Sequence, residues 1–334
     1  MRSVLPVLLS LTLPLLAARS SMAGLPKLPA TKFLVGWTPE SLVTGSPIIF
    51  SVKSSAALKS LNGTWLNRRV FFYFDAASQT WYGFAGVGIN SVPGNHQLKL
   101  EAKLLRGARV SYSHSVPVSR VISQKVDLSV PEKYTEPDAE EMTRIIQERT
   151  VKRGVFEQTT EKRLWAGRFV PPINSQITEA FGTERIFNGV RQSLHQGLDF
   201  RASIGTPVGA MNSGRVTIAR PMFFEGGFVV IYHGCGLTTL YMHLDRIRVN
   251  EGDCVKSGQI IGYSGASGRA TGPHLHVGVR WQGLYLDPAA LLAMKMDDLS
   301  KNAVLKKEEA KRAKTGKRGK TRKTTQETET GRVN

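Results

Sequence analysis

The residues best suited to chemistry are two histidines in the stretch Thr271-Gly-Pro-His274-Leu-His276-Val277. In a strand, side chains at positions i and i+2 leave the same face, roughly 7 Å apart. When two imidazoles lie on one rigid face, one ring can bind a metal ion and the other can transfer protons. Because His-x-His also occurs in ordinary sheets, a site needs further ligands elsewhere in the chain.

Two other segments provide such residues. The first is His195-Gln-Gly-Leu-Asp199, and the second is Tyr241-Met-His243-Leu. Catalytic zinc usually takes three His or carboxylate ligands and keeps a fourth position open. His195, Asp199 and one histidine of the 274–276 pair fill that quota, and the remaining histidines are left to act as acid or base. The set favours metal-assisted hydrolysis.

The region from residue 177 to residue 288 resembles the M23 (LytM/lysostaphin-type) zinc metallopeptidase domain, over about a third of the chain. The matching pieces stand in family order. They are Phe181-Gly182, Arg185, Asn188-Gly189, His195-x-x-x-Asp199, Gly205-Thr-Pro-Val208, His233-Gly, Tyr241-x-His243-Leu, Gly252-Asp-x-Val, Gly258-Gln-x-Ile-Gly and Thr271-Gly-Pro-His-Leu-His276.

The resemblance implies one Zn²⁺ ion ligated by His195, Asp199 and His276. It also implies that His243 and His274 form the catalytic pair, which activates water and stabilises the tetrahedral intermediate. The implied fold is an antiparallel β-sheet with the site in a groove, and the implied substrates are the peptides of peptidoglycan. The expected function is therefore that of a zinc metalloendopeptidase that cuts peptide cross-links through a zinc-activated water.

A second function class stays open. Some members of this family lack ligands and activate cell-wall amidases, so a non-hydrolytic wall-binding or amidase-activating protein is the alternative. All five functional positions are filled in this sequence. Which peptide bond is cut does not follow from the sequence.

Other polar residues are set aside. His233 matches a family position that is not a ligand, and His96 and His114 lack metal-ligand spacing. Ser264 stands in Gly262-Tyr-Ser264-Gly265, but a nucleophile elbow needs Gly-x-Ser-x-Gly at a strand-to-helix turn, and position 266 is Ala.

The elements that must position the site are mainly β-strands. Residues 165–294 alternate short β-prone runs with glycine turns and show no βαβ spacing, which predicts antiparallel sheets. Residues 24–125 show the same kind of pattern without chemistry, with strands expected near 48–52, 69–74, 81–85 and 97–102, and predict an immunoglobulin-like β-sandwich. Residues 126–164 are expected to form a helical linker with a helix over 138–149, and this region or the sandwich is a candidate cover for the groove.

The N-terminal residues suggest export, and the C-terminal residues carry much of the positive charge of the chain. Residues 1–23 have the charge, the short apolar run and the small-x-small cleavage pattern of a signal peptide, so the mature protein is expected in the periplasm or cell envelope without a transmembrane segment. The formal charge is +19, and residues 301–334 hold twelve Lys or Arg against four Glu. A disordered basic tail over 295–334 either is simply solvated or contacts an anionic envelope surface. After export, nucleic acid is not an expected partner.

The chain has two cysteines, Cys235 and Cys254. In an oxidising compartment a disulfide between them is the favoured expectation, worth about 3 kcal/mol in the chain-entropy model. Two separate free thiols are the alternative.

Overall fold

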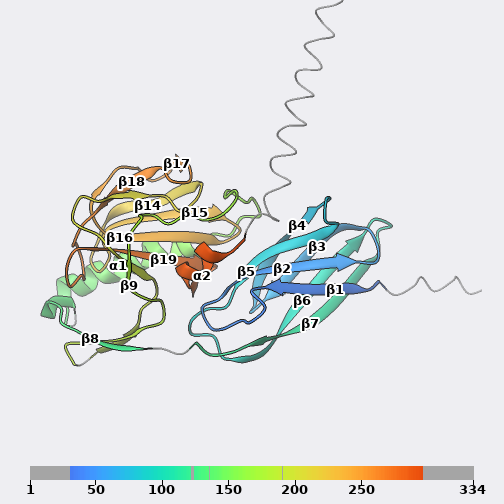
Figure 1. The fold of residues 1–334 in the computed structure, drawn as a ribbon, viewed down its shortest axis with the longest axis horizontal. Coiled ribbons are helices and arrows are strands. Elements are labelled where there is room, and N and C mark those ends of the chain that lie inside the picture. The colour runs from blue at the N-terminus through green and yellow to red at the C-terminus, as the bar shows by residue number, and fades with distance from the viewer. Residues whose placement is uncertain (1–30, 122–123, 135, 190, 296–334) are drawn as a thin grey trace, which may run out of the picture. The chain divides into compact units, whose positions relative to one another are not determined.

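The computed structural model describes residues 31–121, 124–134, 136–189 and 191–295 of this chain (Figure 1). The predicted signal peptide over 1–23 and the predicted basic tail, apart from Lys295, lie outside the described residues. Strands dominate the described part, so the prediction of a mainly β protein is confirmed. None of the described helices combines the length and the apolar character needed to span a bilayer.

The first seven strands form one antiparallel sheet with the order β1-β2-β5-β4-β3-β6-β7 (Figure 1, blue to green). Their bounds are β1 Phe33–Thr38, β2 Pro47–Ser54, β3 Leu58–Trp65, β4 Arg68–Asp75, β5 Thr80–Gly86, β6 Gly94–Leu104 and β7 Arg109–Val118. Each expected strand is present. β1, β3 and β7 were not expected. In β7 only two residues are buried, so its sequence gives a weak apolar signal for a strand.

The immunoglobulin-like topology is not confirmed, because the strands follow one continuous hydrogen-bonded path. β4 makes that path possible by changing partner halfway. Its first half, through Phe71, pairs with β3, whereas its second half, from Phe72, pairs with β5. The parts of the sheet on either side of β4 contribute to one core. In this core the rings of Phe50 in β2 and Trp65 in β3 lie edge to face, with centroids 5.3 Å apart.

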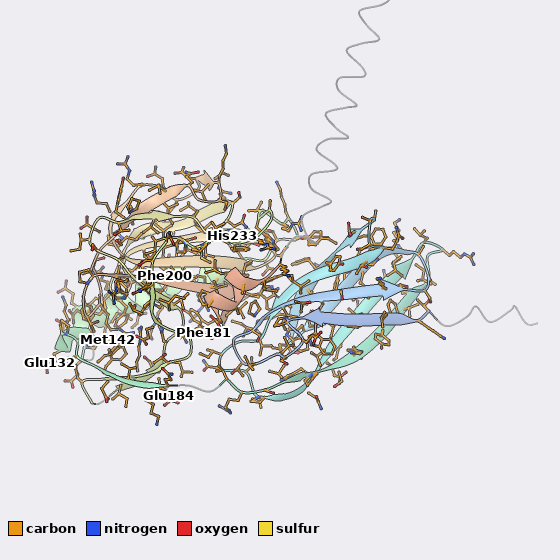
Figure 2. All side chains as sticks on the ribbon, in the orientation of Figure 1. Glu132, Met142, Phe181, Glu184, Phe200 and His233 are labelled. Atoms are coloured by element: carbon orange, nitrogen blue, oxygen red, sulfur yellow. The ribbon has the colours of Figure 1, made fainter. Side chains whose placement is uncertain are left out.

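The segment after this sheet is only partly helical. It begins with strand β8 (Lys125–Leu128), followed by the 3₁₀ turn η1 (Glu132–Tyr134) and helix α1 (Ala139–Phe156). Asp138 caps α1 in a capping box with Glu141, which explains why the helix begins there. Of the apolar residues in the first half of α1, Ile145 is buried, but Met142 and Ile146 are exposed (Figure 2 labels Met142).

β8 is the element that local sequence could not predict. It pairs in parallel with β10 (Glu184–Phe187), from Lys125 opposite Glu184 to Leu128 opposite Phe187. β10 in turn pairs with β11 (Arg191–Leu194), which completes a three-stranded sheet. The partner strand lies about sixty residues away along the chain, so no periodicity within residues 125–128 reveals the pairing.

The remaining strands form a ten-stranded antiparallel sheet, as the sequence predicted for residues 165–294. Its main path is β17-β14-β15-β16-β19-β12-β9, with β13, β18 and β20 attached beside it. The strand bounds are β9 Ile177–Glu179, β12 Leu198–Arg201, β13 Pro207–Gly209, β14 Gly214–Met222, β15 Gly226–Gly234, β16 Leu237–Ile247, β17 Cys254–Val255, β18 Ile260–Ser264, β19 His274–Trp281 and β20 Leu284–Leu286. Helix α2 (Pro288–Ala293) follows, capped by Asp287.

The favoured disulfide is wrong. Cys235 and Cys254 are both free thiols, the first buried and the second exposed. Cys235 lies in the turn between β15 and β16, where its Sγ is 2.9 Å from the Tyr73 hydroxyl. Cys254 lies in the edge strand β17, opposite Arg215. The two thiols are therefore held by different neighbours on different elements.

Candidate active site

The centre of the site is a pair of neighbouring strands, β12 and β19. Their antiparallel register places Asp199 directly opposite His276 and Arg201 opposite His274. Apolar residues alternate with these side chains: Phe200 and Leu275 are buried and face each other in the same register. The alternation fixes the register, because a slip by one residue would bury the polar set in the core.

Three donor atoms converge at this point. His195 Nε2 lies 3.1 Å from Asp199 Oδ1 and 3.0 Å from His276 Nδ1, and His276 Nδ1 lies 2.7 Å from Asp199 Oδ1. Three donors bound at ~2.0–2.2 Å to one tetrahedral ion are roughly 3.3 Å apart. The arrangement is thus close to a zinc-binding geometry, with one carboxylate and two imidazoles, and these three residues are the group of the described chain that could hold a metal ion.

The backbone around this group is shaped to fit it. Gly197 lies against the His276 ring, and a Cβ at this position would be only 2.4 Å from His276 Nε2. Only glycine leaves room for the ring at this position. His195 Nδ1 donates to the carbonyl of Ala180 at 2.8 Å, which leaves Nε2 free to bind a metal.

Electrostatics keep the donors in the forms that bind metal. Burial alone would raise the pKa of the Asp199 carboxyl, but the adjacent His276 and His195 hold that pKa well below its usual range. Arg185 also donates to Asp199 Oδ2 and forms a bidentate pair with Glu179. Burial lowers the pKa of His276 to about 4, so its imidazole is neutral at pH 7.

His243 owes its position to a bulge in β16. The register with β15 passes from Val229 opposite Tyr241 to Gly227 opposite Leu244, so two residues of β16 face one residue of β15. His243 takes up the extra length with a φ of +61°, an unusual value for a residue other than glycine. The bulge turns its ring toward the metal-ligand group, and its centroid lies 6.1 Å from that of His276.

His243 and His274 form a pair of rings with centroids 4.7 Å apart. His243 Nδ1 donates to the Ser267 carbonyl at 2.7 Å, and His274 Nδ1 donates to the Gly272 carbonyl at 2.8 Å. Both rings therefore keep Nε2 unprotonated in the neutral form. His274 Nε2 lies 3.9 Å from Asp199 Oδ2, so this ring faces the metal ligands. Burial, followed by the nearby His274 and His276, lowers the pKa of His243 to about 3.

The structure thus brings all five expected site residues together. Sequence reasoning missed the residues that orient them: Glu179, Ser267, and the carbonyl groups of Ala180 and Gly272. It also included Arg185 in the motif without giving it a role. Glu179 and Arg185 could have been found from the sequence, because they are opposite charges in a β-rich segment just before His195. The backbone carbonyls could not, because any residue type provides one.

His233 and Ser264, which were not expected in the site, form hydrogen bonds typical of buried structural residues. His233 is buried at the end of β15 (Figure 2), with Nδ1 2.8 Å from the Ser213 carbonyl and Nε2 2.8 Å from the Thr239 hydroxyl. Ser264 is also buried, and its hydroxyl donates to the Ser203 carbonyl at 2.6 Å. Neither side chain contacts the metal-ligand group.

A cavity of about 380 Å³ opens at the metal-ligand group. Asp199 and His274 line one part of it, and Leu128 and Val130 from the segment around β8 line another. Asn188 holds this segment in place: its side-chain amide accepts from Val130 N and donates to Val130 O, both at 3.0 Å. The segment before α1 therefore forms one wall of the site.

Comparison with known proteins matches residues 193–288 to peptidase family M23. Peptidoglycan DD-endopeptidase ShyA of Vibrio cholerae serotype O1 is 41% identical over 142 residues, which cover 42% of this chain and 32% of that protein. Peptidoglycan DD-endopeptidase ShyB of the same organism is 40% identical over 123 residues, 36% of this chain and 28% of that protein. The matches thus span only about a third of the length of these relatives.

Among solved structures, a Pseudomonas aeruginosa protein described as a peptidase M23 has a similar fold. It is 24% identical with a TM-score of 0.57, and the match covers 75% of this chain and 94% of that one. The similarity therefore extends beyond residues 193–288 into the strands that precede them. Residues 193–288, the part of the chain that matches peptidase family M23, contain all five residues of the site.

Proposed function

We propose that this protein is an exported, zinc-dependent endopeptidase that hydrolyses peptide cross-links of bacterial peptidoglycan. One observation carries the proposal: His195, Asp199 and His276 present three converging donor atoms beside the rings of His243 and His274. The names of the relatives, peptidoglycan DD-endopeptidases, support the substrate class. Residues 1–23 support export on sequence alone.

In this proposal His195, Asp199 and His276 would hold one Zn²⁺ ion through their converging donor atoms. The ion would supply Lewis-acid chemistry, because bound zinc polarises a carbonyl and lowers the pKa of water from 15.7 toward about 7. Arg185 keeps the Asp199 carboxylate oriented through its second oxygen, which leaves Oδ1 for the metal. The Ala180 carbonyl does the same for the His195 ring.

The two remaining rings handle protons and charge. Because both Nδ1 atoms donate to backbone carbonyls, each Nε2 is an acceptor when its ring is neutral and a donor when it is charged. His243, the more buried of the two, accepts the proton of the attacking water. His274 lies at the cavity and stabilises the oxyanion that develops on the substrate carbonyl. A positioned imidazole of this kind contributes typically 10²–10⁴-fold in rate.

We further propose that the segment around β8 restricts access to the groove. Leu128 and Val130 line the cavity together with the site residues, and Asn188 pairs with both backbone polar groups of Val130. A peptide substrate that extends along the same wall would compete with this contact. In the full chain, Asn188→Ala is expected to raise turnover of peptidoglycan if the segment must move. Unchanged or lower turnover with normal zinc content would argue against a covering role.

The main test is muropeptide analysis by mass spectrometry after residues 24–334 are incubated with peptidoglycan sacculi. Parallel samples contain a chelator or the variant His243→Ala. We expect cross-linked dimers to fall to monomers only with the zinc-loaded wild type, and the product masses then identify the bond that is cut.

An inert wild-type protein with full zinc content would instead support the alternative, a non-hydrolytic wall-binding or amidase-activating protein. No residue of the site favours that alternative, since every position expected for catalysis is filled. The same preparation also tests the tail, because deletion of residues 296–334 should weaken binding to anionic envelope surfaces if the tail contacts them.

A further inference from the structure

We propose that the chain has a second binding site, separate from the active site, for a phosphate-bearing ligand. The site is a cavity of about 800 Å³ between α1, the start of β4 and the hairpin that joins β19 to β20. Its lining contains five cationic side chains and one acidic side chain, Glu157. The cationic residues are Arg68, Arg149, Lys152, Arg153 and Arg280.

Three of the cations come from one face of α1. Arg149, Lys152, Arg153 and Phe156 follow the spacing i, i+3, i+4 and i+7, which places them side by side on a helix. Like charges at i and i+4, such as Arg149 and Arg153, destabilise a helix slightly. Phe156 anchors this face on the ten-stranded sheet, where it is buried against Ile218 and neighbouring apolar residues.

Arg280 forms the floor of the cavity. Its guanidinium carbon lies 3.9 Å from the Phe156 ring centroid and 4.4 Å from that of Tyr285, so two aromatic rings fix its position. Nη2 donates to the Gly283 carbonyl, but the Nε atom is buried with no hydrogen-bond partner among the described residues. Arg68 approaches from β4, where Nε donates to the Gln282 carbonyl at 2.8 Å. Burial, with Arg280 nearby, lowers the pKa of Arg68.

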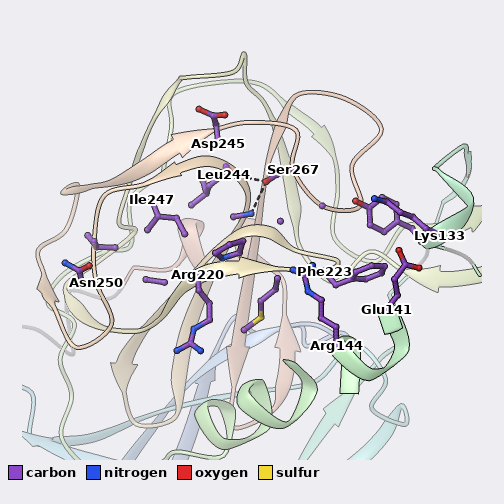
Figure 3. A pocket seen from close by; sticks show the side chains of 18 of the residues that line it. Lys133, Glu141, Arg144, Arg220, Phe223, Leu244, Asp245, Ile247, Asn250 and Ser267 are labelled. Carbon is purple, nitrogen blue, oxygen red and sulfur yellow. Dashed lines mark hydrogen bonds between the residues drawn. The ribbon is translucent and has the colours of Figure 1, made fainter. Parts of the chain in front are cut away.

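The four arginines of this cavity form no salt bridge with a carboxylate in the described part of the chain. Lys152, in contrast, pairs with Glu225. A cavity of similar size, about 830 Å³, which is lined by residues near the start of α1, shows the contrast (Figure 3). There Arg144 pairs with Glu148, Arg220 pairs with Glu251, and Asp245 adds a further negative charge.

The number and type of cations indicate a phosphate group. A carboxylate carries one charge, whereas a phosphate monoester carries about two negative charges and three acceptor oxygens, which several arginines can share. Guanidinium groups bind phosphate in bidentate fashion, and this cavity offers four of them. Its volume lies within the range of roughly 300–1,000 Å³ typical of ligand sites, so the phosphate is expected to be part of a larger molecule. The rings of Phe156 and Tyr285 offer apolar contact to the rest of such a ligand.

The test is calorimetric titration of the zinc-loaded full chain with inorganic phosphate at low ionic strength. The variant Arg149→Gln/Arg153→Gln removes two exposed charges of the cavity, and we expect it to weaken binding by about 10-fold or more. The matched control is Arg106→Gln/Arg248→Gln, which removes the same charge from exposed positions outside the cavity. It should bind phosphate as the wild type does.

Three results would overturn the proposal: no binding by the wild type, equal weakening in both double variants, or binding that disappears when zinc is removed with a chelator. The last would place the phosphate on the active-site metal. Arg280→Gln provides a second variant at the floor of the cavity, with thermal unfolding as the check on its fold.

Flotation with vesicles identifies the source of the phosphate. Phosphatidic acid in phosphatidylcholine presents a lipid phosphomonoester, and loss of flotation by the cavity variant alone would point to a lipid headgroup. Phosphate binding without cavity-dependent flotation would point to a soluble phosphorylated molecule.

Discussion

The same ten-stranded sheet buries histidines in two different ways. At His233, one ring nitrogen contacts the Ser213 carbonyl and the other the Thr239 hydroxyl, so no atom of the ring is left for a ligand. At His195, by contrast, the backbone holds only Nδ1, and Nε2 points at Asp199 and His276. Both residues are buried, so burial does not separate them. The difference lies in the partner of the second nitrogen, which decides whether a buried histidine supports the fold or a ligand.

The contrast between His233 and His195 predicts the largest effect on zinc binding and activity when a metal ligand is lost. His195→Ala or His276→Ala should abolish peptidoglycan turnover and weaken zinc affinity by more than ~100-fold, beyond the roughly 10–100-fold cost of losing an outer partner. Zinc content after dialysis, measured by atomic absorption, is the readout. His233→Gln is the matched control and should keep one zinc ion per chain. If His233→Gln lost zinc as readily, the distinction between the two kinds of buried histidine would fail.

A smaller effect is expected for His243, whose free nitrogen serves the reaction rather than the metal. His243→Ala should lower kcat by about 10²–10⁴-fold, because a positioned acid or base is lost. Zinc content should remain at one ion per chain. A variant that lost zinc and activity together would show that His243 is a ligand.

The pH dependence of the free energy of unfolding should identify His233 as a structural histidine. Burial lowers the pKa of His233 to about 4 from an ordinary value of 6.5, so between these values the unfolded chain binds the proton more readily. The stability that neutral His233 contributes is complete above about pH 6.5 and is lost as the pH falls toward 4, by up to about 3 kcal/mol.

Denaturant unfolding of the metal-free chain at a series of pH values measures this loss. Burial also lowers the pKa values of His243 and His276, so the informative quantity is the difference between the wild type and His233→Gln. The variant should show a shallower fall in the free energy of unfolding below pH 6.5. Parallel curves would mean that His233 is not held neutral.

The smallest effect concerns the groups that orient the ligands. Arg185→Gln removes the cation that holds Asp199 Oδ2 and Glu179, and should weaken zinc affinity by roughly 10–100-fold. A competition titration with a zinc-binding dye measures the change. Arg201→Gln is a suitable control, because Arg201 lines the same cavity but forms no salt bridge with a described residue. Equal affinities for wild type and Arg185→Gln would limit Arg185 to a role in folding.

The sequence alone determined the chemistry at the centre of this protein. Residue types decide which atoms can bind zinc, and the i, i+2 spacing of His274 and His276 in a strand follows from local geometry. Alternation and glycine turns were sufficient to predict antiparallel strands around them. The capping residues of α1 were also local, which is why that helix could be predicted close to its true start.

Only the tertiary structure decided what depends on contacts between distant segments. The pairing of β8 with β10, the change of partner in the middle of β4, and the separation of Cys235 from Cys254 have no local signature. The bulge that turns His243 toward the metal ligands depends on how β16 registers with β15. The same is true of the cationic cavity, because Arg149 and Arg280 are far apart in the sequence and become neighbours only when α1 packs on the sheet.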